Sequence, residues 1–324
     1  MLYPLKFHPI LKEKIWGGTK LKTILNKPCV SGTTGESWEI STVPDNISRV
    51  SNGVHQGITL KELITKYKGD LVGKNVYPSF GDTFPLLIKY IDATQDLSVQ
   101  LHPGDTLAKK RHNSFGKTEM WYVVQADPGT QLIVDFKKKT DKEAYQVYLE
   151  NNKLVDLLNF ETISKGDSYM IKAGTIHAIG KGALIAEIQQ TSDITYRVYD
   201  WDRTDDDGNA RALHTEQAID ALNFETNNNC KLSFEKNSNA VNEVASIPYF
   251  TTNFINVVSS FERNYEEIPS FIILMCVEGN GTLTFDGGTE TITLGDTVLI
   301  PSVIEKIFLE EDSGGMKLLE VYIK

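Results

Sequence analysis

The stretch Leu97–Pro103, which reads LSVQLHP, is the most informative segment of the 324-residue chain. In a strand, successive side chains alternate between two faces, so Leu97, Val99 and Leu101 would share an apolar face. The opposite face would carry Ser98, Gln100 and His102. An apolar back behind a Gln-x-His front is the pattern expected of a strand that forms the floor of a pocket.

Two further segments complete a candidate metal site. Glu119 begins a second strand-like run, and His177 ends a third, Tyr169–His177, which an Ala-Gly-Thr turn closes. With Gln100 and His102, these residues supply two imidazoles, one carboxylate and one amide oxygen. Such a set suits zinc or another divalent transition metal and leaves a position for water or substrate. Each residue alone could be structural, but the four in this order predict a metal centre.

The composition places the chain among ordered globular proteins and argues against several classes of partner. Its hydrophobic content of 40% supports a large core, and its length suggests about two domains. A net charge of −10 argues against binding to nucleic acid or to anionic membranes. No apolar run reaches membrane-spanning length, and the N-terminus lacks the apolar segment of a signal peptide. Cys29, Cys230 and Cys276 have no CxxC spacing, so we expect a cytoplasmic protein without a thiolate metal site.

Short β-like runs bounded by Gly, Pro, Asn and Asp dominate the chain. Their spacing predicts an antiparallel barrel or sandwich rather than βαβ units. The expected strands are Gly35–Ile40, Leu86–Ile91, Leu97–Leu101, Met120–Gln125, Gln131–Val134, Ser168–Ile171 and Leu184–Gln189, with five or six more after Phe250. Helical patterns interrupt them. The expected helices are Thr59–Tyr67, Asp105–Arg111, Asp141–Leu158 and Thr215–Leu222, the last with Thr215 as N-cap.

A polar, Asn-rich stretch from Asn227 to Asn242 is typical of a domain boundary. We therefore expect a catalytic, metal-binding domain over residues 1–230 and a C-terminal domain over residues 240–324.

An internal echo indicates that the two domains are related β modules. Residues 166–177 align with residues 295–306, so that Lys306 stands in the place of His177. The counterpart of Glu119 is one of two neighbours, Phe271 or Ile272. The first copy keeps its metal ligands and the second has lost them, which predicts a metal site in the N-terminal module alone.

Several segments carry a resemblance to a known family, and they are densest between Pro85 and Trp201. The segments are Lys14–Gly18, Gly35–Ser41, Pro85–Ala93, Leu97–Pro103, Lys117–Tyr122, Gly174–Ala178 and Gln189–Trp201. Together they resemble the cupin-type (class I) mannose-6-phosphate isomerases. The two N-terminal segments are also similar to the short bacterial branch of that family.

The resemblance implies a mainly β fold: a cupin jelly roll (double-stranded β-helix) with helical insertions, and a second, smaller C-terminal jelly roll. It also implies one zinc ion (Zn2+) per chain, in the N-terminal module. The implied ligands are those already selected by spacing: Gln100, His102, Glu119 and His177. Family positions in the substrate site fall on Ser98, Lys117 and the active-site Arg197. The Gly-rich stretch with a lysine that follows the arginine in larger members is replaced by Val198–Arg203, which leaves the phosphate-binding residues open.

The implied activity is a zinc-dependent aldose–ketose isomerase that interconverts mannose 6-phosphate and fructose 6-phosphate by proton transfer through a cis-enediolate. A phosphorylated hexose would be the partner, and the protein would be a monomer or weak homodimer. We expect Arg197, Lys117 and Asp193 to act in catalysis. The residues expected to bind the substrate are Ser98, Lys117, Arg197 and Glu187. Lys117, Asp193 and Glu187 are the alternatives for the acid–base group.

Two alternatives from other classes stay open. A non-catalytic sugar-phosphate-binding cupin would be expected to have lost metal ligands, whereas all four are present in this sequence. A cupin dioxygenase that uses iron usually has a His-rich ligand set with open sites for oxygen. A set of one Gln and only two His matches that pattern less well.

Overall fold

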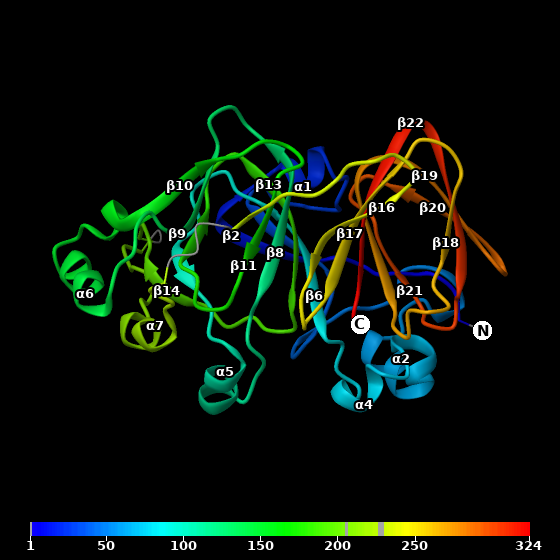
Figure 1. The fold of residues 1–324 in the computed structure, drawn as a ribbon, viewed down its shortest axis with the longest axis horizontal. Coiled ribbons are helices and arrows are strands. Elements are labelled where there is room, and N and C mark those ends of the chain that lie inside the picture. Colours follow the sequence, from blue (N-terminus) through cyan, green and yellow to red (C-terminus); the bar gives the residue numbers. More distant parts are fainter. Residues whose placement is uncertain (1, 205–206, 226–229) are drawn as a thin grey trace.

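The computed structural model describes residues 2–204, 207–225 and 230–324. Their strands form three large sheets and one small ribbon that joins β4 (Thr42–Val43) to β5 (Asn46–Ile47). Two β-rich bodies lie side by side, the second running from yellow to red, and most helices line one rim of the pair (Figure 1). This arrangement confirms the mainly β fold with a second, C-terminal jelly roll.

The N-terminal body is a sandwich of a seven-stranded and a five-stranded sheet. In spatial order, the larger sheet consists of β15 (Lys231–Leu232), β11 (Ser168–Ile171), β8 (Glu119–Ala126), β13 (Ala183–Gln190), β6 (Leu86–Asp92), β3 (Thr34–Ile40) and β2 (Ile10–Gly18). The smaller sheet consists of β10 (Leu158–Thr162), β9 (Gln131–Phe136), β12 (His177–Ile179), β7 (Val99–Leu101) and β14 (Tyr196–Tyr199). Trp121 and Val123 of β8 share one core with Leu132 and Val134 of β9, so the two sheets face each other.

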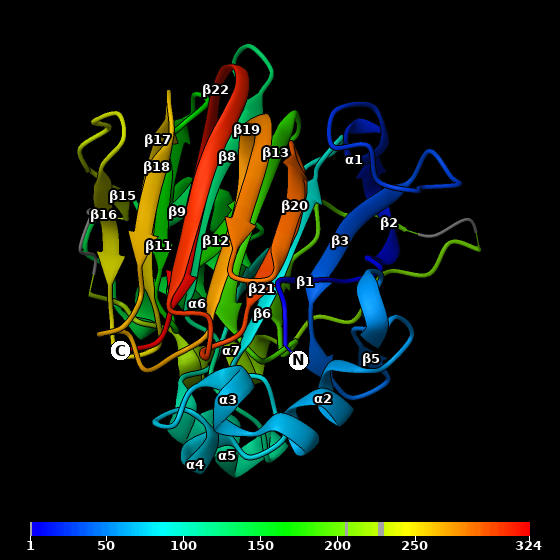
Figure 2. The ribbon, with the colours of Figure 1, turned by 90° about the vertical axis from the view of Figure 1, so that its right-hand side faces the viewer.

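The third sheet belongs mainly to the C-terminal body. In spatial order, its path is β1 (Leu5–Lys6), β21 (Thr297–Ile300), β19 (Ile272–Phe285), β22 (Lys306–Tyr322), β17 (Thr251–Val257) and β16 (Val241–Ser246), while β18 (Phe261–Asn264) pairs with β22 and β20 (Gly288–Thr293) with β19. Figure 2 shows the long strands β19 and β22 next to each other. The first strand of the chain also joins this sheet, because Leu5 pairs with Leu299.

The two bodies pack through the outer faces of their sheets. Met120 and Tyr122 alternate with the inward residues of β8 and therefore point away from the sandwich. They enter a core that also contains Met275 and Val321 of the third sheet. Tyr90 of β6 adds a hydrogen bond across this interface, since its hydroxyl donates to Cys276 O at 3.0 Å.

The short helices lie in the connections between strands. They are α1 (Lys20–Thr23), α2 (Leu60–Tyr67), α3 (Gly69–Val72), α4 (Tyr77–Phe80), α5 (Asp105–His112), α6 (Lys142–Glu150) and α7 (Thr215–Ala221), with 3-10 turns η1 (Gly53–His55) and η2 (Leu154–Leu157). The prediction for α2 is confirmed and has a clear local cause. Thr59 and Glu62 form a reciprocal capping box, in which each side chain accepts a hydrogen bond from the other residue's backbone N–H.

Two helix predictions are wrong in detail. The helix expected over Asp141–Leu158 ends at Glu150, because Asn152 takes a left-handed conformation with φ of 56° and the chain then makes a 3-10 turn before entering β10. Thr215 is the first residue of α7 and not its N-cap. His214 occupies the N-cap position without a side-chain capping bond.

Two strand predictions also need correction. The strand expected from Leu97 begins at Val99, so Leu97 does not share the apolar face of the segment but lines a cavity beside Ser98. The strand expected to end at His177 ends instead at Ile171. A turn with Gly174 at φ of 84° follows, and His177 begins the next strand.

No helix in the described part of the chain is long and apolar enough to cross a membrane. A cytoplasmic location stays a prediction. The division at residues 230–240 also stays a prediction, and residues 226–229 of the boundary segment lie outside the described residues.

Candidate metal centre and its cavity

His102, Glu119 and His177 converge between the two sheets of the N-terminal body. The two imidazole Nε2 atoms lie 3.4 and 3.5 Å from the two carboxylate oxygens of Glu119, and all three side chains are only 1% exposed. Two ligands bound at about 2.1 Å to a tetrahedral metal lie about 3.4 Å apart. The three side chains therefore fit a divalent metal ion, as the sequence predicted.

Backbone carbonyls fix the orientation of both imidazoles. His102 Nδ1 lies 2.9 Å from Ile194 O, and His177 Nδ1 lies 2.9 Å from Thr175 O. Each Nδ1–H can donate to its carbonyl, which leaves each Nε2 as a lone-pair atom aimed at Glu119. Holding a metal-binding histidine by its other ring nitrogen is the usual arrangement around protein-bound metals.

Burial and nearby charge favour the protonation states that a metal requires. Burial lowers the pKa of His102 to about 3, and the ammonium of Lys117 acts in the same direction. Burial also lowers the pKa of His177. Burial alone would raise the pKa of Glu119, but the ammonium of Lys117 holds it well below its usual value. The site thus presents two neutral imidazoles and one carboxylate.

Gln100 lies beside the triad, directly opposite His177 in the pairing of β7 with β12. Its Nε2 is 3.5 Å from His177 Nε2, and its Oε1 accepts a hydrogen bond from Ser98 Oγ at 3.2 Å. The side chain reaches the site, but its nitrogen and not its oxygen faces the triad. Coordination through Oε1 would require the amide to turn over, after which Nε2 could donate to Ser98.

A cavity of about 370 Å³ opens beside the triad. Its wall includes all the predicted substrate and catalytic residues: Ser98, Lys117, Glu187, Asp193 and Arg197. Six cations line it, namely Lys12, Lys14, Lys89, Lys117, Arg197 and Arg211, against three carboxylates, Glu36, Glu187 and Asp193. A cation-rich cavity in a chain of net charge −10 is suited to an anionic ligand.

Lys117 stands next to the triad, with its Nζ 3.2 Å from both Glu119 Oε2 and His102 Nε2. Asp193 is exposed at the rim of the cavity. These two of the three predicted acid–base alternatives therefore occupy different depths of the same cavity.

Glu187 lies on the cavity floor in a row of paired residues. Trp121, Glu187, Lys89 and Trp38 lie opposite one another on four adjacent strands. Glu187 accepts a hydrogen bond from Trp121 Nε1 at 3.1 Å and lies 3.2 Å from Lys89 Nζ. Burial raises the pKa of Glu187 despite the attraction of Lys89.

Lys89 is a site residue that our reading of the sequence did not single out. It is only 5% exposed, and its Nζ contacts the carboxylates of both Glu187 and Glu36. Burial alone would lower the pKa of Lys89, but these carboxylates raise it, so the side chain stays charged. The missed signal is a lysine inside Leu86–Asp92, a strand buried at every position, because a lysine is rarely so buried without a partner.

Arg197 belongs to a row of site residues that crosses the smaller sheet. In this row, Gln100 pairs with His177 on one side and with Arg197 on the other. Its Nη1 donates to Ala212 O at 3.0 Å, while its buried Nε has no hydrogen-bond partner in the described part of the chain. Among the described residues, no carboxylate forms an ion pair with Arg197. Asp200, three residues along the chain, binds other arginines instead.

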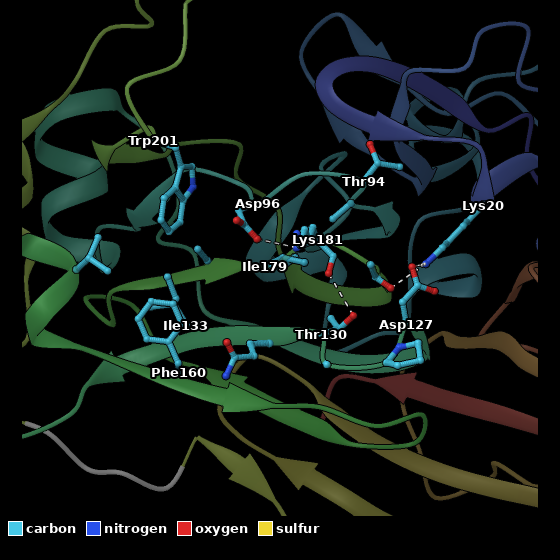
Figure 3. A pocket seen from close by; sticks show the side chains of 18 residues that line it. Lys20, Thr94, Asp96, Asp127, Thr130, Ile133, Phe160, Ile179, Lys181 and Trp201 are labelled. Atoms are coloured by element: carbon cyan, nitrogen blue, oxygen red, sulfur yellow. Dashed lines mark hydrogen bonds and ion pairs between the residues drawn. The ribbon is translucent and has the colours of Figure 1, made fainter.

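A second and larger cavity of about 580 Å³ lies elsewhere on the N-terminal body (Figure 3). Phe160, Ile133 and Trp201 lie on one side of it, and Lys20 and Asp127 pair at 2.9 Å on the other. None of the predicted site residues lines this cavity. The smaller cavity beside the triad is therefore the candidate functional site.

Comparison with known proteins identifies the family of the chain. Residues 4–160 match the family "Phosphomannose isomerase type I, catalytic domain", and residues 241–323 match "Mannose-6-phosphate isomerase, cupin domain". The mannose-6-phosphate isomerase of Streptococcus mutans is 36% identical over 94% of each chain. The chain belongs to the type I phosphomannose isomerase family.

Other members of the family support the assignment along the whole chain. ManA of Bacillus subtilis, a mannose-6-phosphate isomerase, is 34% identical over 95% of this chain and 96% of its own. The crystal structure of mannose 6-phosphate isomerase from Bacillus subtilis is 32% identical, covers 99% of this chain and 100% of its own, and superposes with a TM-score of 0.89. The resemblance identified from sequence motifs is thus confirmed at the level of family and fold.

The strand pairing also identifies the counterparts of the site in the C-terminal body. Glu119 pairs with Ile171, and Ile272 pairs with Ile300, the residue that the internal echo aligns with Ile171. Ile272 and not Phe271 therefore stands in the place of Glu119. In the described residues, the one group of histidine, cysteine and acidic side chains close enough to hold a metal is the triad of the N-terminal body.

Proposed function

We propose that the protein is a zinc-dependent isomerase that interconverts mannose 6-phosphate and fructose 6-phosphate. The observation that carries this proposal is the metal-binding triad at the edge of a cation-rich cavity. The names of the family members in Streptococcus mutans and Bacillus subtilis support the choice of substrate. Two histidines and one glutamate are a ligand set of known catalytic zinc sites, and they leave a fourth position for Gln100 or water.

The isomerisation moves a proton between C2 and C1 of the open-chain sugar while the carbonyl moves the other way. Zinc held by the triad would polarise the carbonyl and stabilise the negative charge of a cis-enediolate. Lys117 adds a positive charge at the same end of the cavity, 3.2 Å from Glu119. Ser98 supplies a hydroxyl beside Gln100 that can bind a hydroxyl of the sugar.

We propose Glu187 as the group that carries the proton. Its carboxyl lies in the cavity, and its raised pKa suits an acid–base group that works near neutral pH. Lys89 beside it would stabilise the carboxylate between proton transfers. Lys117 and Asp193 remain the predicted alternatives. Arg197 is the wrong type of residue for this step, because a guanidinium does not readily deprotonate.

The alternatives from other classes gain no support from a specific observation. A sugar-phosphate-binding protein without activity would not need a triad with ordered imidazoles and an ionised carboxylate. A monomer or weak homodimer stays a prediction.

The test is metal removal and reconstitution. We expect chelated protein to lose the conversion of fructose 6-phosphate to mannose 6-phosphate and to regain it with zinc, as followed by NMR. The variant His102→Ala should not regain it. Conversion by metal-free protein would contradict the zinc dependence, and absence of conversion by fully zinc-loaded protein would contradict the isomerase assignment.

A further inference from the structure

A cluster of three arginines lies at the edge of the cavity, and of these only Arg197 was predicted from the sequence to act in catalysis. Arg203 and Arg211 donate to the same carboxylate, and Arg197 Nη1 donates to Ala212 O, the residue that follows Arg211. Burial lowers the pKa of Arg197, and the charges of Arg211 and Arg203 act in the same direction. Asp200, which is 6% exposed, joins the cluster at its centre. Asp200 comes from the segment Val198–Arg203, where the sequence left the phosphate-binding residues open.

Asp200 binds two of the three arginines. Arg211 donates to it through two nitrogens, Nε to Oδ2 at 2.7 Å and Nη2 to Oδ1 at 2.5 Å. Arg203 Nη2 donates to Oδ1 at 2.6 Å. Burial alone would raise the pKa of Asp200, but these bonds lower it, so Asp200 stays ionised. Three guanidinium groups around this carboxylate leave two positive charges in excess.

The three arginines differ in which guanidinium nitrogens remain free to bind a ligand in the cavity. Arg203 uses every nitrogen of its guanidinium, since Nη1 also donates to Asp96 O and Nε to Asp200 O, and it does not line the cavity. Arg211 lines the cavity, and its hydrogen bonds to Asp200 leave its Nη1 for a ligand. Arg197 lines the cavity, and its buried Nε has no hydrogen-bond partner among the residues that the structure describes.

Of the two arginines that line the cavity, Arg197 lies nearer the triad and Arg211 lies farther from it. Strands pack about 4.8 Å apart, so the row His177–Gln100–Arg197 places Arg197 two strands, or about 10 Å, from His177. The segment that carries Arg211 runs beside β14 on its outer edge, because Arg197 Nη1 donates to Ala212 O and His214 N donates to Arg197 O. Arg211 therefore lies beyond the strand of Arg197 and farther from the triad.

We propose that Arg211, held by Asp200, binds the phosphate group of the substrate together with Arg197. A phosphate monoester carries a charge of about −1.5 to −2 near neutral pH, which matches the excess of two positive charges. Guanidinium groups bind phosphate oxygens by paired, charge-assisted hydrogen bonds. The inference rests on the proposed function for the identity of the substrate, whose carbonyl end would lie at the triad and whose phosphate would lie at Arg211.

The test compares Arg211→Gln with Arg203→Gln, a matched control that removes an arginine from the same carboxylate but not from the cavity wall. The readouts are kcat and KM for fructose 6-phosphate, and the dissociation constant of inorganic phosphate by calorimetry. We expect Arg211→Gln to raise KM and the phosphate dissociation constant by about tenfold or more, with kcat changed less than about threefold. Arg203→Gln should lower the melting temperature and leave phosphate binding within about threefold.

The outcomes separate this inference from the proposed function. If both variants weaken phosphate binding equally, Arg211 acts through Asp200, and the inference is overturned. Unchanged phosphate binding in Arg211→Gln also overturns it. If the wild type binds phosphate through Arg211 but converts no hexose phosphate, the proposed function fails and the anion site stands. Should Arg211→Gln not fold, Arg211→Lys keeps the charge without the paired geometry, and an intermediate loss of phosphate binding is then expected.

Discussion

Glu187 and Glu320 occupy equivalent positions in the two bodies of the protein. Glu187 pairs with Trp121 on one side and with Lys89 on the other, and Glu320 pairs with Leu274 and Asn253 in the same way. The strands next to these two sets are β11 and β21, and they lie in the segments 166–177 and 295–306 that the internal echo aligns. The same strand position therefore has different surroundings in the two bodies. Glu187 faces an open cavity, whereas Glu320 lies in a closed polar cluster.

The cluster around Glu320 satisfies the carboxylate completely. Arg263 donates to both oxygens at 2.8 Å, Asn253 Nδ2 donates at 2.9 Å and Tyr265 donates through its hydroxyl at 3.0 Å. Glu320 itself is fully buried. In the C-terminal body these side chains surround the carboxylate at the strand position where Glu187 faces a cavity in the N-terminal body.

Removing the charge of Glu320 should destabilise the fold strongly. Glu320→Gln leaves the guanidinium of Arg263, whose side chain is only 15% exposed, without its counter-charge. Breaking an ion pair of this kind typically costs about 3–5 kcal/mol. Urea unfolding measures it. Glu262→Gln is the matched control, because Glu262 pairs with Lys306 on the surface of the same body and its loss should cost less than about 1 kcal/mol. An equal loss of unfolding free energy in both variants would show that the buried cluster stabilises the fold no more than a surface ion pair does.

The metal content should depend on the triad of the N-terminal body. We expect about one zinc per chain in the wild type and none in the double variant His102→Ala, His177→Ala, as measured by metal analysis. His8→Ala, which alters an exposed histidine, is the control and should keep its zinc. Full zinc in the double variant would remove these histidines from the metal site.

Replacing Arg197 should mainly lower kcat, whereas replacing Arg211 should mainly raise KM. Arg197 lies on the strand next to Gln100, between the triad and Arg211, so its charge can act on the reacting atoms of the substrate as well as on its phosphate. Arg197→Ala should lower kcat by about 10²-fold or more, with some rise in KM, while the fold and the zinc survive. A rise in KM with unchanged kcat would limit Arg197 to phosphate anchoring, and kinetics like those of the wild type would remove it from the site.

The acid stability of the protein should depend on Glu36. Burial alone would raise the pKa of Glu36, but Lys89 and Lys14 lower it to about 2. Because the folded pKa lies below the unfolded value, this group stabilises the fold fully above pH 4.5, and the contribution fades as the pH falls toward 2. Glu36→Gln should therefore be less stable than the wild type at pH 7, and the gap should narrow by about 1 kcal/mol at pH 4.

Urea unfolding at the two pH values measures this gap. Glu267→Gln is the control, since Glu267 is exposed and forms no ion pair with the described residues. A gap for Glu36→Gln that does not change with pH would mean that the carboxylate is not stabilised in the folded protein.

The sequence predicted the triad because local pattern determines it. Glu119 begins a strand. His102 directly precedes Pro103, and His177 follows the turn at Gly174. Such turn-forming residues mark the ends of strands in the sequence. The family resemblance then added Arg197, whose position beside Gln100 is a matter of strand pairing.

The rest of the cavity depends on long-range pairing that local pattern cannot supply. Lys14 and Glu36 reach the site because β2 and β3 add to the edge of the larger sheet, with irregular register between them. Arg211 reaches it because its segment returns along β14. The helix predicted over Asp141–Leu158 failed for a related reason, since a strand that pairs with β9 overrides the helical spacing at its end.

The last prediction concerns the route of the hydrogen atom during isomerisation. Glu187 lies in the cavity with a raised pKa, so a side chain is available to carry a proton between C2 and C1. A proton on a carboxyl group can exchange with water, whereas a hydride shift moves hydrogen within the substrate. Conversion of fructose 6-phosphate in deuterated water should therefore place deuterium at the reacting carbon, as detected by NMR. A shielded carboxyl can return part of the original proton, so partial incorporation agrees with the enediolate route. Complete absence of deuterium after many turnovers at full activity would exclude that route and leave a hydride shift, with the isomerase assignment intact.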